Sequence, residues 1–278
     1  VLEQKGHKVD FLDLSGVDNY LDVLDDYLSI DNSATVVGVT ATTPQVPYAV
    51  KIANHIFGKV QKTILGGPHV TLMHAASKRE KKKNLSNEDF SNLPMPARHL
   101  VDVDSYKYLI EGEKSISLIA QLGCPFQCTF CSGRNSPFLR KIRTRTTQSV
   151  VDEIEHLYLT YNMKGFMLYD DELNVNKEMV HLMREIIKLQ KRHNTEFILR
   201  GFIKAELFNQ EQAEVMREAG FRWLLTGFES GDERILRNIK KRATREDNTR
   251  CVELGRNAGL KVKALMSIGH AGESPESI

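Results

Sequence analysis

Residues 123–131 read Gly-Cys-Pro-Phe-Gln-Cys-Thr-Phe-Cys and place three cysteines, Cys124, Cys128 and Cys131, within eight residues. They follow the mostly apolar run 116–122, which predicts a strand that ends in a thiol-lined loop. Thiolates are the usual protein ligands of iron–sulfur clusters, and a short loop lets three sulfur atoms converge on one cluster. Three ligands leave one iron of a four-iron cluster open. The stretch therefore predicts a cluster-binding loop at a strand end.

Other uses of the three cysteines fit the sequence less well. A zinc site needs a fourth ligand at close spacing, and the next candidates, His156 and Cys251, lie far along the chain. Four cysteines in 278 residues, without a secretory segment at the start, disfavour structural disulfides. Cys251 falls within an expected helix and is interpreted as an ordinary buried thiol. Cysteine usage predicts a cytoplasmic protein.

Composition limits the remaining classes. A hydrophobic content of 41% over 278 residues is enough for one large domain or two modest ones. The net charge of +2 gives no reason to expect nucleic acid or a membrane surface as partner, and no apolar run is long enough to span a bilayer. The first residue is Val1 and the last is Ile278, at what read as the tail of one helix and the start of another. We expect a chain truncated at both ends.

The first seventy residues alternate between two periodicities. Apolar and β-branched runs predict strands at 9–14, 34–40 and 62–71, and helical spacing predicts helices at 17–30 and 42–57. This order predicts a doubly wound, Rossmann-like parallel sheet. The third strand runs into Gly66-Gly67-Pro68-His69, at the edge where such sheets bind ligands. A plain strand-to-helix turn is the alternative interpretation of these four residues.

The second half repeats strand and helix after a linker punctuated by prolines. Expected strands are 116–122, 165–172, 196–202, 222–231 and 261–270, and expected helices are 147–159, 177–192, 209–219 and 248–257. Five such units predict most of a partial TIM-like (β/α)6 barrel whose last unit is missing. The predicted domains are 1–92 for the Rossmann-like domain, 93–114 for the linker and 115–278 for the barrel.

The spacing Cys124-x3-Cys128-x2-Cys131, with the aromatic Phe130 before the last cysteine, resembles the signature of the radical S-adenosylmethionine (radical SAM) enzymes. The resemblance implies that the three thiolates hold a [4Fe–4S] cluster whose fourth iron binds the amino and carboxylate groups of SAM. It also implies that an electron from the reduced cluster cleaves SAM to methionine and a 5′-deoxyadenosyl radical. An electron donor such as flavodoxin or ferredoxin is then expected.

The N-terminal segment, in this context, resembles the cobalamin-binding domain that precedes the barrel in one large radical SAM class. The resemblance implies cobalamin contacts at Gly66, Gly67 and His69. The Asp-x-His-x-x-Gly signature that supplies a cobalt ligand in other cobalamin domains is not present, so His69 is not assigned as a cobalt ligand. The lysine-rich run 78–83 is interpreted as a solvated helix face.

Parallel barrels carry their chemistry at the carboxyl ends of the strands, and polar residues follow several of the expected strands. An acid after the second strand, within Asp170-Asp171-Glu172, is implied by the resemblance to hold the SAM amino group. A helix N-cap cluster is the alternative for these acids. The implied SAM contacts are Phe130, Asp170, Asp171, Arg200, Glu229, Ser230, Lys241 and Ser267. His270 stands where relatives often have proline or an apolar residue, which points to a role toward substrate.

Together these features predict a cobalamin-dependent radical SAM methyltransferase that acts on an unactivated carbon or a phosphinate. A radical SAM oxidoreductase or cyclase with the same two domains is one alternative. A methylthiotransferase acting on RNA is disfavoured, because the N-terminal half lacks the second cysteine triad of that class. A non-catalytic iron–sulfur or corrin-binding sensor is also kept open. Neither the catalytic residues nor the substrate, whether small molecule, lipid or peptide, can be assigned.

Overall fold

The computed structural model describes residues 1–30, 34–67, 86–135 and 139–278. The chain divides into two compact units, one formed by Lys8–Lys83 and the other by Val1–His7 together with Asn84–Ile278. The domain limits expected at residues 92 and 115 stay a prediction. No helix in the described ranges is long and apolar enough to cross a membrane.

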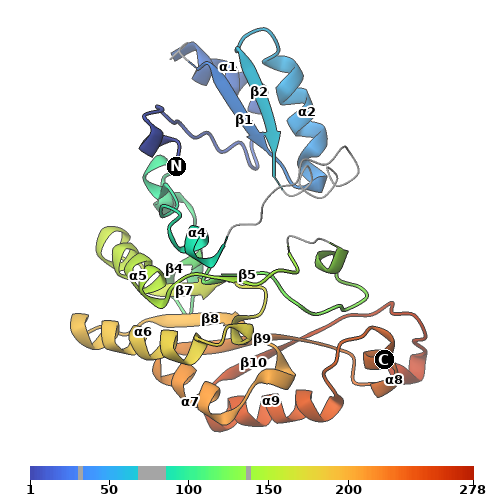
Figure 1. Cartoon of the computed structure of the whole chain (residues 1–278). Coiled ribbons are helices and arrows are strands. Elements are labelled where there is room, and N and C mark those ends of the chain that lie inside the picture. The colour runs from blue at the N-terminus through green and yellow to red at the C-terminus, as the bar shows by residue number, and fades with distance from the viewer. Residues whose placement is uncertain (31–33, 68–85, 136–138) are drawn as a thin grey trace. The chain divides into compact units, whose positions relative to one another are not determined.

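In its described residues, the smaller unit has a two-stranded parallel sheet and the helices α1 (Tyr20–Ile30) and α2 (Val46–His55) (Figure 1). Strand β1 (Val36–Thr40) pairs in parallel with β2 (Lys62–Gly66), from Val36 opposite Lys62 to Thr40 opposite Gly66. Helix α1 precedes β1, and α2 connects the two strands. A proline in the first turn of α2 suits its start, since its missing N–H has no intrahelical partner there. The expected strand, helix, strand order is confirmed for this part.

Residues 9–14 do not form the strand that the sequence suggested. Their pattern places Phe11 and Leu12 side by side, which breaks the alternation needed to bury one face, and Phe11 is 49% exposed. A strand also needs a neighbour with which to share a ladder, and in the described part of the chain β1 and β2 pair only with each other. The expected strand 62–71 ends at Gly66, and residues 68–71 lie outside the described ranges.

The larger unit is built on a curled six-stranded sheet with the order β10-β9-β8-β7-β4-β3 (Figure 1). Its strands are β3 (Leu109–Ile110), β4 (Glu113–Leu118), β7 (Gly165–Leu168), β8 (Ile198–Phe202), β9 (Phe221–Glu229) and β10 (Lys261–Met266). All neighbours are parallel except β3, which forms an antiparallel hairpin with β4. These five parallel strands confirm the partial TIM-like barrel.

Two edges of the curled sheet meet at one end. Glu111, in the turn between β3 and β4, accepts a hydrogen bond from Lys261 at 2.9 Å and another from the indole of Trp223. Lys261 and Trp223 are opposite each other in the β9–β10 ladder. The turn at Glu111 therefore joins the β3–β4 hairpin to the far edge and holds the curl.

Helices follow the parallel strands and lie along one side of the sheet (Figure 1). They are α5 (Thr147–Tyr161), α6 (Met179–His193), α7 (Gln210–Glu218) and α9 (Arg245–Asn257). The short α8 (Glu233–Asn238) lies apart from this row and has its own small apolar cluster, and α4 (Asn87–Ser91) precedes the sheet. Thr146, Asn209 and Thr244 cap the starts of α5, α7 and α9 with their side chains. Every residue of β7 is buried, as expected for a central parallel strand covered on both faces. Helix α8 was not expected from the sequence.

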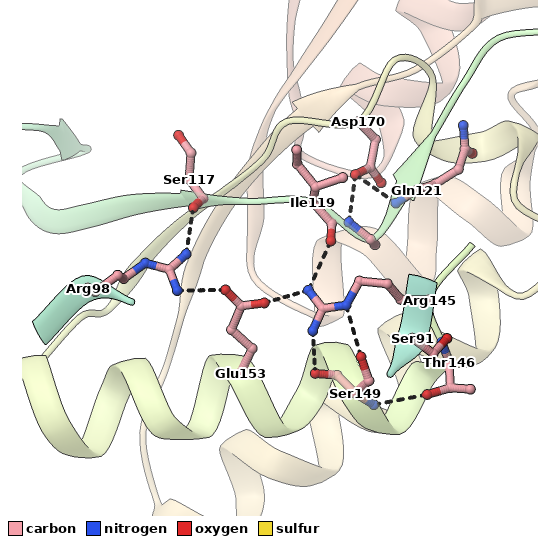
Figure 2. Close-up of polar contacts among 11 residues, drawn as sticks. Ser91, Arg98, Ser117, Ile119, Gln121, Arg145, Thr146, Ser149, Glu153 and Asp170 are labelled. Carbon is pink, nitrogen blue, oxygen red and sulfur yellow. Dashed lines mark hydrogen bonds and ion pairs between the residues drawn. The ribbon is translucent and has the colours of Figure 1, made fainter. Parts of the chain in front are cut away.

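A buried ion-pair network fixes the end of β4 from the helical side (Figure 2). Glu153, on α5, is 1% exposed and lies between the guanidinium groups of Arg98, at 2.7 Å, and Arg145, at 2.5 Å. Arg98 also donates to the carbonyl of Ser117, and Arg145 to the carbonyl of Ile119. One carboxylate on a helix thus orients two arginines that hold the backbone leading to the cysteine loop.

Candidate functional site

The three cysteines lie in a hairpin that follows the first parallel strand. After β4 the chain forms β5 (Gln121–Leu122), which pairs with β6 (Arg143–Thr144), and the cysteine loop connects the two. Gly123 opens the loop with φ +96°, and a Cβ there would clash with the carbonyl oxygen of Lys141. Only glycine fits this position without strain, so the Gly-Cys start of the loop has a steric reason.

Two acids after β7, Asp170 and Asp171, support the backbone of this loop, and Figure 2 shows the contacts of Asp170. Oδ1 of Asp170 accepts hydrogen bonds from the backbone N–H groups of Ala120, at 2.8 Å, and Gln121, at 3.1 Å. Asp171 accepts one from the N–H of Gly123 at 2.6 Å. Burial raises the pKa of Asp170 to about 7, against the lowering effect of its two backbone donors. Two predicted SAM contacts are therefore already engaged with the loop backbone.

The third acid of the strand end, Glu172, is placed differently. Its carboxyl group has no hydrogen-bond or ion-pair partner within the described ranges. Burial raises the pKa of Glu172 to about 7, while the ammonium groups of Lys241 and Lys204 act to lower it. The same carboxylate acts electrostatically on the thiols of Cys124 and Cys128. Glu172 is the strand-end acid whose whole carboxyl group is unengaged in the described ranges, whereas Asp170 leaves only Oδ2 without a partner. The sequence did not single out Glu172.

All three loop cysteines are free thiols. Cys128 is buried, Cys124 is half-buried and Cys131 is exposed, and a turn joins the N–H of Cys131 to the carbonyl of Cys128 at 3.1 Å. Burial raises the pKa of Cys124 to about 11 and also raises that of Cys128. Both are uncharged at neutral pH unless a cationic centre binds them, so loading with metal would release protons.

The donor set fits an iron–sulfur cluster. Within the described ranges no three His, Cys, Asp or Glu side chains are arranged around a single metal ion. A four-iron cluster needs a different arrangement from a single metal ion. Each thiolate binds a different iron, so the three sulfur atoms do not converge on one point. Three free cysteines in one hairpin, with two buried ammonium groups beside them, fit that arrangement.

A second cluster of side chains contains several of the predicted SAM contacts. Glu229, at the end of β9, pairs with Lys241 at 3.2 Å and accepts a hydrogen bond from Ser267 Oγ at 2.8 Å. Nε2 of His270 lies 2.7 Å from the same Oγ, and the His270 ring packs 5.3 Å from the ring of Phe130. Since Ser267 uses its proton on Glu229, the Nε2–H tautomer of His270 donates to Ser267. The structure thus brings together residues from the cysteine loop, β9 and the segment after β10.

The remaining predicted contacts lie elsewhere or are used locally. Ser230 is buried and accepts a hydrogen bond from the N–H of Asp232, at the start of α8. Arg200 donates to the sulfur of Met167 and stacks over the ring of Tyr108 at 5.4 Å, so its guanidinium group is used outside the Glu229 cluster. In the smaller unit, Gly67 has φ +94°, and a Cβ there would lie 2.7 Å from the carbonyl oxygen of Ala41. His69 lies outside the described residues.

A parallel half-barrel with a three-cysteine hairpin after its first strand defines the class of fold that radical SAM domains share. The family model described as the Radical SAM superfamily matches residues 118–278, which is more than half of the chain. The chain belongs to this superfamily. The resemblance inferred from the cysteine spacing is confirmed.

Curated relatives extend beyond the barrel. An uncharacterized methyltransferase of Pyrococcus horikoshii is 25% identical over 87% of this chain and 62% of its own length. The cytidylyl-2-hydroxyethylphosphonate methyltransferase of Streptomyces wedmorensis is 27% identical over 68% of this chain and 38% of its own length. The chain therefore spans less than two thirds of either relative.

Solved structures share the fold of the whole chain. The radical SAM methyltransferase TsrM from Kitasatospora setae, with tryptophan and a SAM analogue bound, matches with a TM-score of 0.80 at 20% identity, over 99% of this chain and 64% of that one. The cobalamin-dependent radical enzyme OxsB matches with a TM-score of 0.74 at 16% identity, over 95% of this chain and 45% of that one. Both likenesses confirm the predicted fold class, with a Rossmann-like part followed by a partial barrel.

Proposed function

We propose that this chain is the cofactor-binding part of a cobalamin-dependent radical SAM methyltransferase. The observation that carries the proposal is the hairpin with three free cysteines at the carboxyl end of the first parallel strand, flanked by an unengaged Glu172 and the buried ammonium groups of Lys204 and Lys241. Radical SAM enzymes also need a reductant and a substrate. A flavodoxin or ferredoxin is the proposed electron donor, and the cytoplasm is the proposed compartment.

Cys124, Cys128 and Cys131 would hold the [4Fe–4S] cluster. When bound, such a cluster supplies the electron that cleaves SAM to methionine and a 5′-deoxyadenosyl radical. The protein's own part is to keep the hairpin in place, which Asp170 and Asp171 do by accepting hydrogen bonds from its backbone. Asp170 and Asp171 would thus affect SAM binding indirectly, by holding the cysteine loop in position.

Contacts to SAM itself are proposed for residues with spare capacity. Glu172 is proposed to bind the ammonium group of SAM. Its carboxylate has no partner within the described ranges, and it is close enough to Cys124 to act on that thiol electrostatically. Lys241 is proposed for the SAM carboxylate, with Glu229 and Ser267 orienting it. Phe130 offers an exposed ring to the nucleoside. Arg200 and Ser230 remain predicted contacts.

The smaller unit is proposed to bind cobalamin, with Gly66, Gly67 and His69 as contacts and residues 1–92 as the domain. Support comes from TsrM with cobalamin and a [4Fe–4S] cluster bound, which matches over 99% of this chain with a TM-score of 0.77. At 20% identity this is a likeness of fold, so the corrin is a proposal for this chain.

Methyl transfer to an unactivated carbon or a phosphinate is favoured by the names of the relatives. One is a phosphonate methyltransferase, and a bacteriochlorophyllide methyltransferase of Chlorobaculum tepidum is 22% identical over 91% of this chain. A second candidate is a cyclase, since the anaerobic magnesium-protoporphyrin IX monomethyl ester cyclase of Rubrivivax gelatinosus is 29% identical over 56% of this chain. The two candidates share the cluster and SAM and differ in whether a methyl group is transferred.

Anaerobic reconstitution tests what the two candidates share, the cluster and SAM cleavage, and whether the chain binds corrin. The full chain is loaded with iron, sulfide and hydroxocobalamin, reduced with dithionite, and supplied with SAM. We expect a cluster spectrum, bound corrin and 5′-deoxyadenosine, with cluster and cleavage lost in Cys124→Ala, Cys128→Ala and Cys131→Ala, and Cys251→Ala as the matched control. Absence of 5′-deoxyadenosine would refute the enzyme and favour a sensor. A cluster without corrin uptake would refute the methyltransferase while leaving the radical SAM assignment.

A further inference from the structure

Lys204 is a buried ammonium that no predicted role explains. It follows β8 by two residues, is 2% exposed, and makes three contacts with its charged end. Nζ lies 2.7 Å from Glu206, donates to the carbonyl of Lys241 at 3.1 Å, and stands 4.3 Å above the centre of the Phe126 ring. A lysine this deeply buried requires compensation, and these contacts supply it.

Phe126 is the contact that connects Lys204 with the cluster site. It lies between Cys124 and Cys128, so the ammonium stands directly against the segment that carries two of the three thiols. The same loop is joined to the segment before Lys241 by a hydrogen bond from the N–H of Thr129 to the carbonyl of Ile239, at 2.8 Å. Lys204 therefore lies between the cysteine loop and the loop that carries Lys241.

Stability alone does not account for a charged pair in this position. A buried ion pair can often be exchanged for apolar residues of similar volume without loss of stability, because desolvation offsets the attraction. A methionine at position 204 would still place apolar atoms beneath Phe126. What it would not supply is a fixed positive charge next to Cys124 and Cys128.

We propose that Lys204 and Glu206 set the reduction potential of the cluster that the proposed function places in this loop. Reduction adds one negative charge to the cluster. The positive charge of Lys204 favours the reduced form, and the carboxylate of Glu206, paired with that ammonium at 2.7 Å, opposes the effect. Lys204 is a positioning residue in this scheme, since it acts through charge and through the Phe126 contact.

The test is a redox titration of the reconstituted full chain in the absence of SAM. Electron paramagnetic resonance monitors the reduced cluster at each potential. Lys204→Met should shift the midpoint potential to more negative values, and Glu206→Gln should shift it to more positive values. The double variant should lie between the two single variants. The surface pair Lys188 and Glu185 on α6, also 2.7 Å apart, gives matched controls: Lys188→Met and Glu185→Gln should leave the potential unchanged.

The opposite signs distinguish charge from structure, because a purely structural role would move both variants the same way or abolish the cluster in both. Shifts of the same sign, or no shift in either variant, would overturn the inference about Lys204 and Glu206. The proposed function would still stand if the unaltered chain binds a cluster. If Lys204→Met does not fold, Glu206→Gln decides alone, since it changes the charge and keeps the shape. An unaltered chain that takes up no cluster overturns both proposals.

Discussion

Glu153 and Glu229 are both acids paired with cationic side chains, but Glu153 supports the backbone and Glu229 lies at the candidate binding site. Glu153 lies on α5 between two guanidinium groups, which spend their other donors on backbone carbonyls. Glu229 lies at the end of β9 with one lysine and one serine hydroxyl, and its backbone has φ +65°. A non-glycine residue in the left-handed region is strained, and such strain is found more often at functional sites.

Spare hydrogen-bonding capacity marks the site more clearly than residue type does. Around Glu153 the donors of both arginines are largely engaged, so the cluster can only hold the backbone. At the strand ends, Glu172 has no partner within the described ranges, and the chain from Glu229 through Ser267 ends at His270, whose other ring nitrogen is still an acceptor. The following changes test this distinction.

Breaking the Glu153 cluster should have the largest effect on stability. Glu153→Gln removes a buried charge from between the part-buried guanidinium groups of Arg98 and Arg145, so we expect a loss of about 3–5 kcal/mol in the free energy of unfolding. Urea unfolding measures it. Glu155→Gln, on the same helix but in a half-buried pair with His193, should cost about 0–1 kcal/mol. Equal losses in the two variants would contradict the distinction.

A smaller loss is expected from Gly123→Ala. The added Cβ meets the carbonyl of Lys141 at a positive φ, so the loop must shift at a cost of about 1–3 kcal/mol. Cluster uptake should fall with it. Gly231→Ala is the matched control, because its Cβ would point into open space and stability should change by less than about 0.5 kcal/mol. Normal cluster content in Gly123→Ala would show that the steric argument is wrong.

Glu229→Gln should matter more for binding than for stability. The amide keeps an acceptor for Ser267 but loses the ion pair with Lys241, and we expect a loss of about 1–2 kcal/mol in unfolding free energy. SAM affinity of the reconstituted chain, measured by equilibrium dialysis, should fall at least tenfold. If SAM affinity is unchanged while the unfolding free energy drops as far as in Glu153→Gln, Glu229 has a structural role like that of Glu153 and not a binding role.

The smallest effect at neutral pH is expected from Asp170→Asn, whose carbonyl can still accept from Ala120 and Gln121. Because the folded-state pKa of Asp170 is raised to about 7, its stabilising effect is full below its ordinary pKa and is lost as pH rises through 7. Unfolding free energies measured from pH 5 to 8 should therefore fall for the unaltered chain relative to the variant, by up to about 1.4 kcal/mol per pH unit. Parallel curves would refute the raised pKa.

The cysteine loop and the order of the barrel strands were predictable from the sequence. Both are local properties: the spacing of Cys124, Cys128 and Cys131 is set within one loop, and the apolar periods of β7 to β10 are set within single elements. Even so, periodicity suggested a strand at 9–14 that does not form, because pairing depends on a neighbour that the local pattern does not contain.

The role of each polar residue depends on contacts that form only in the tertiary structure. Asp170 and Asp171 bind the loop backbone while Glu172 stays unengaged, since the parallel register of β4 and β7 sets which N–H groups lie opposite each acid. Lys204 meets Phe126 across nearly eighty residues of sequence, and no local pattern encodes that contact. Periodicity and spacing are local features of the sequence. Contacts between distant side chains form only once the sheet has curled and brought its strand ends together.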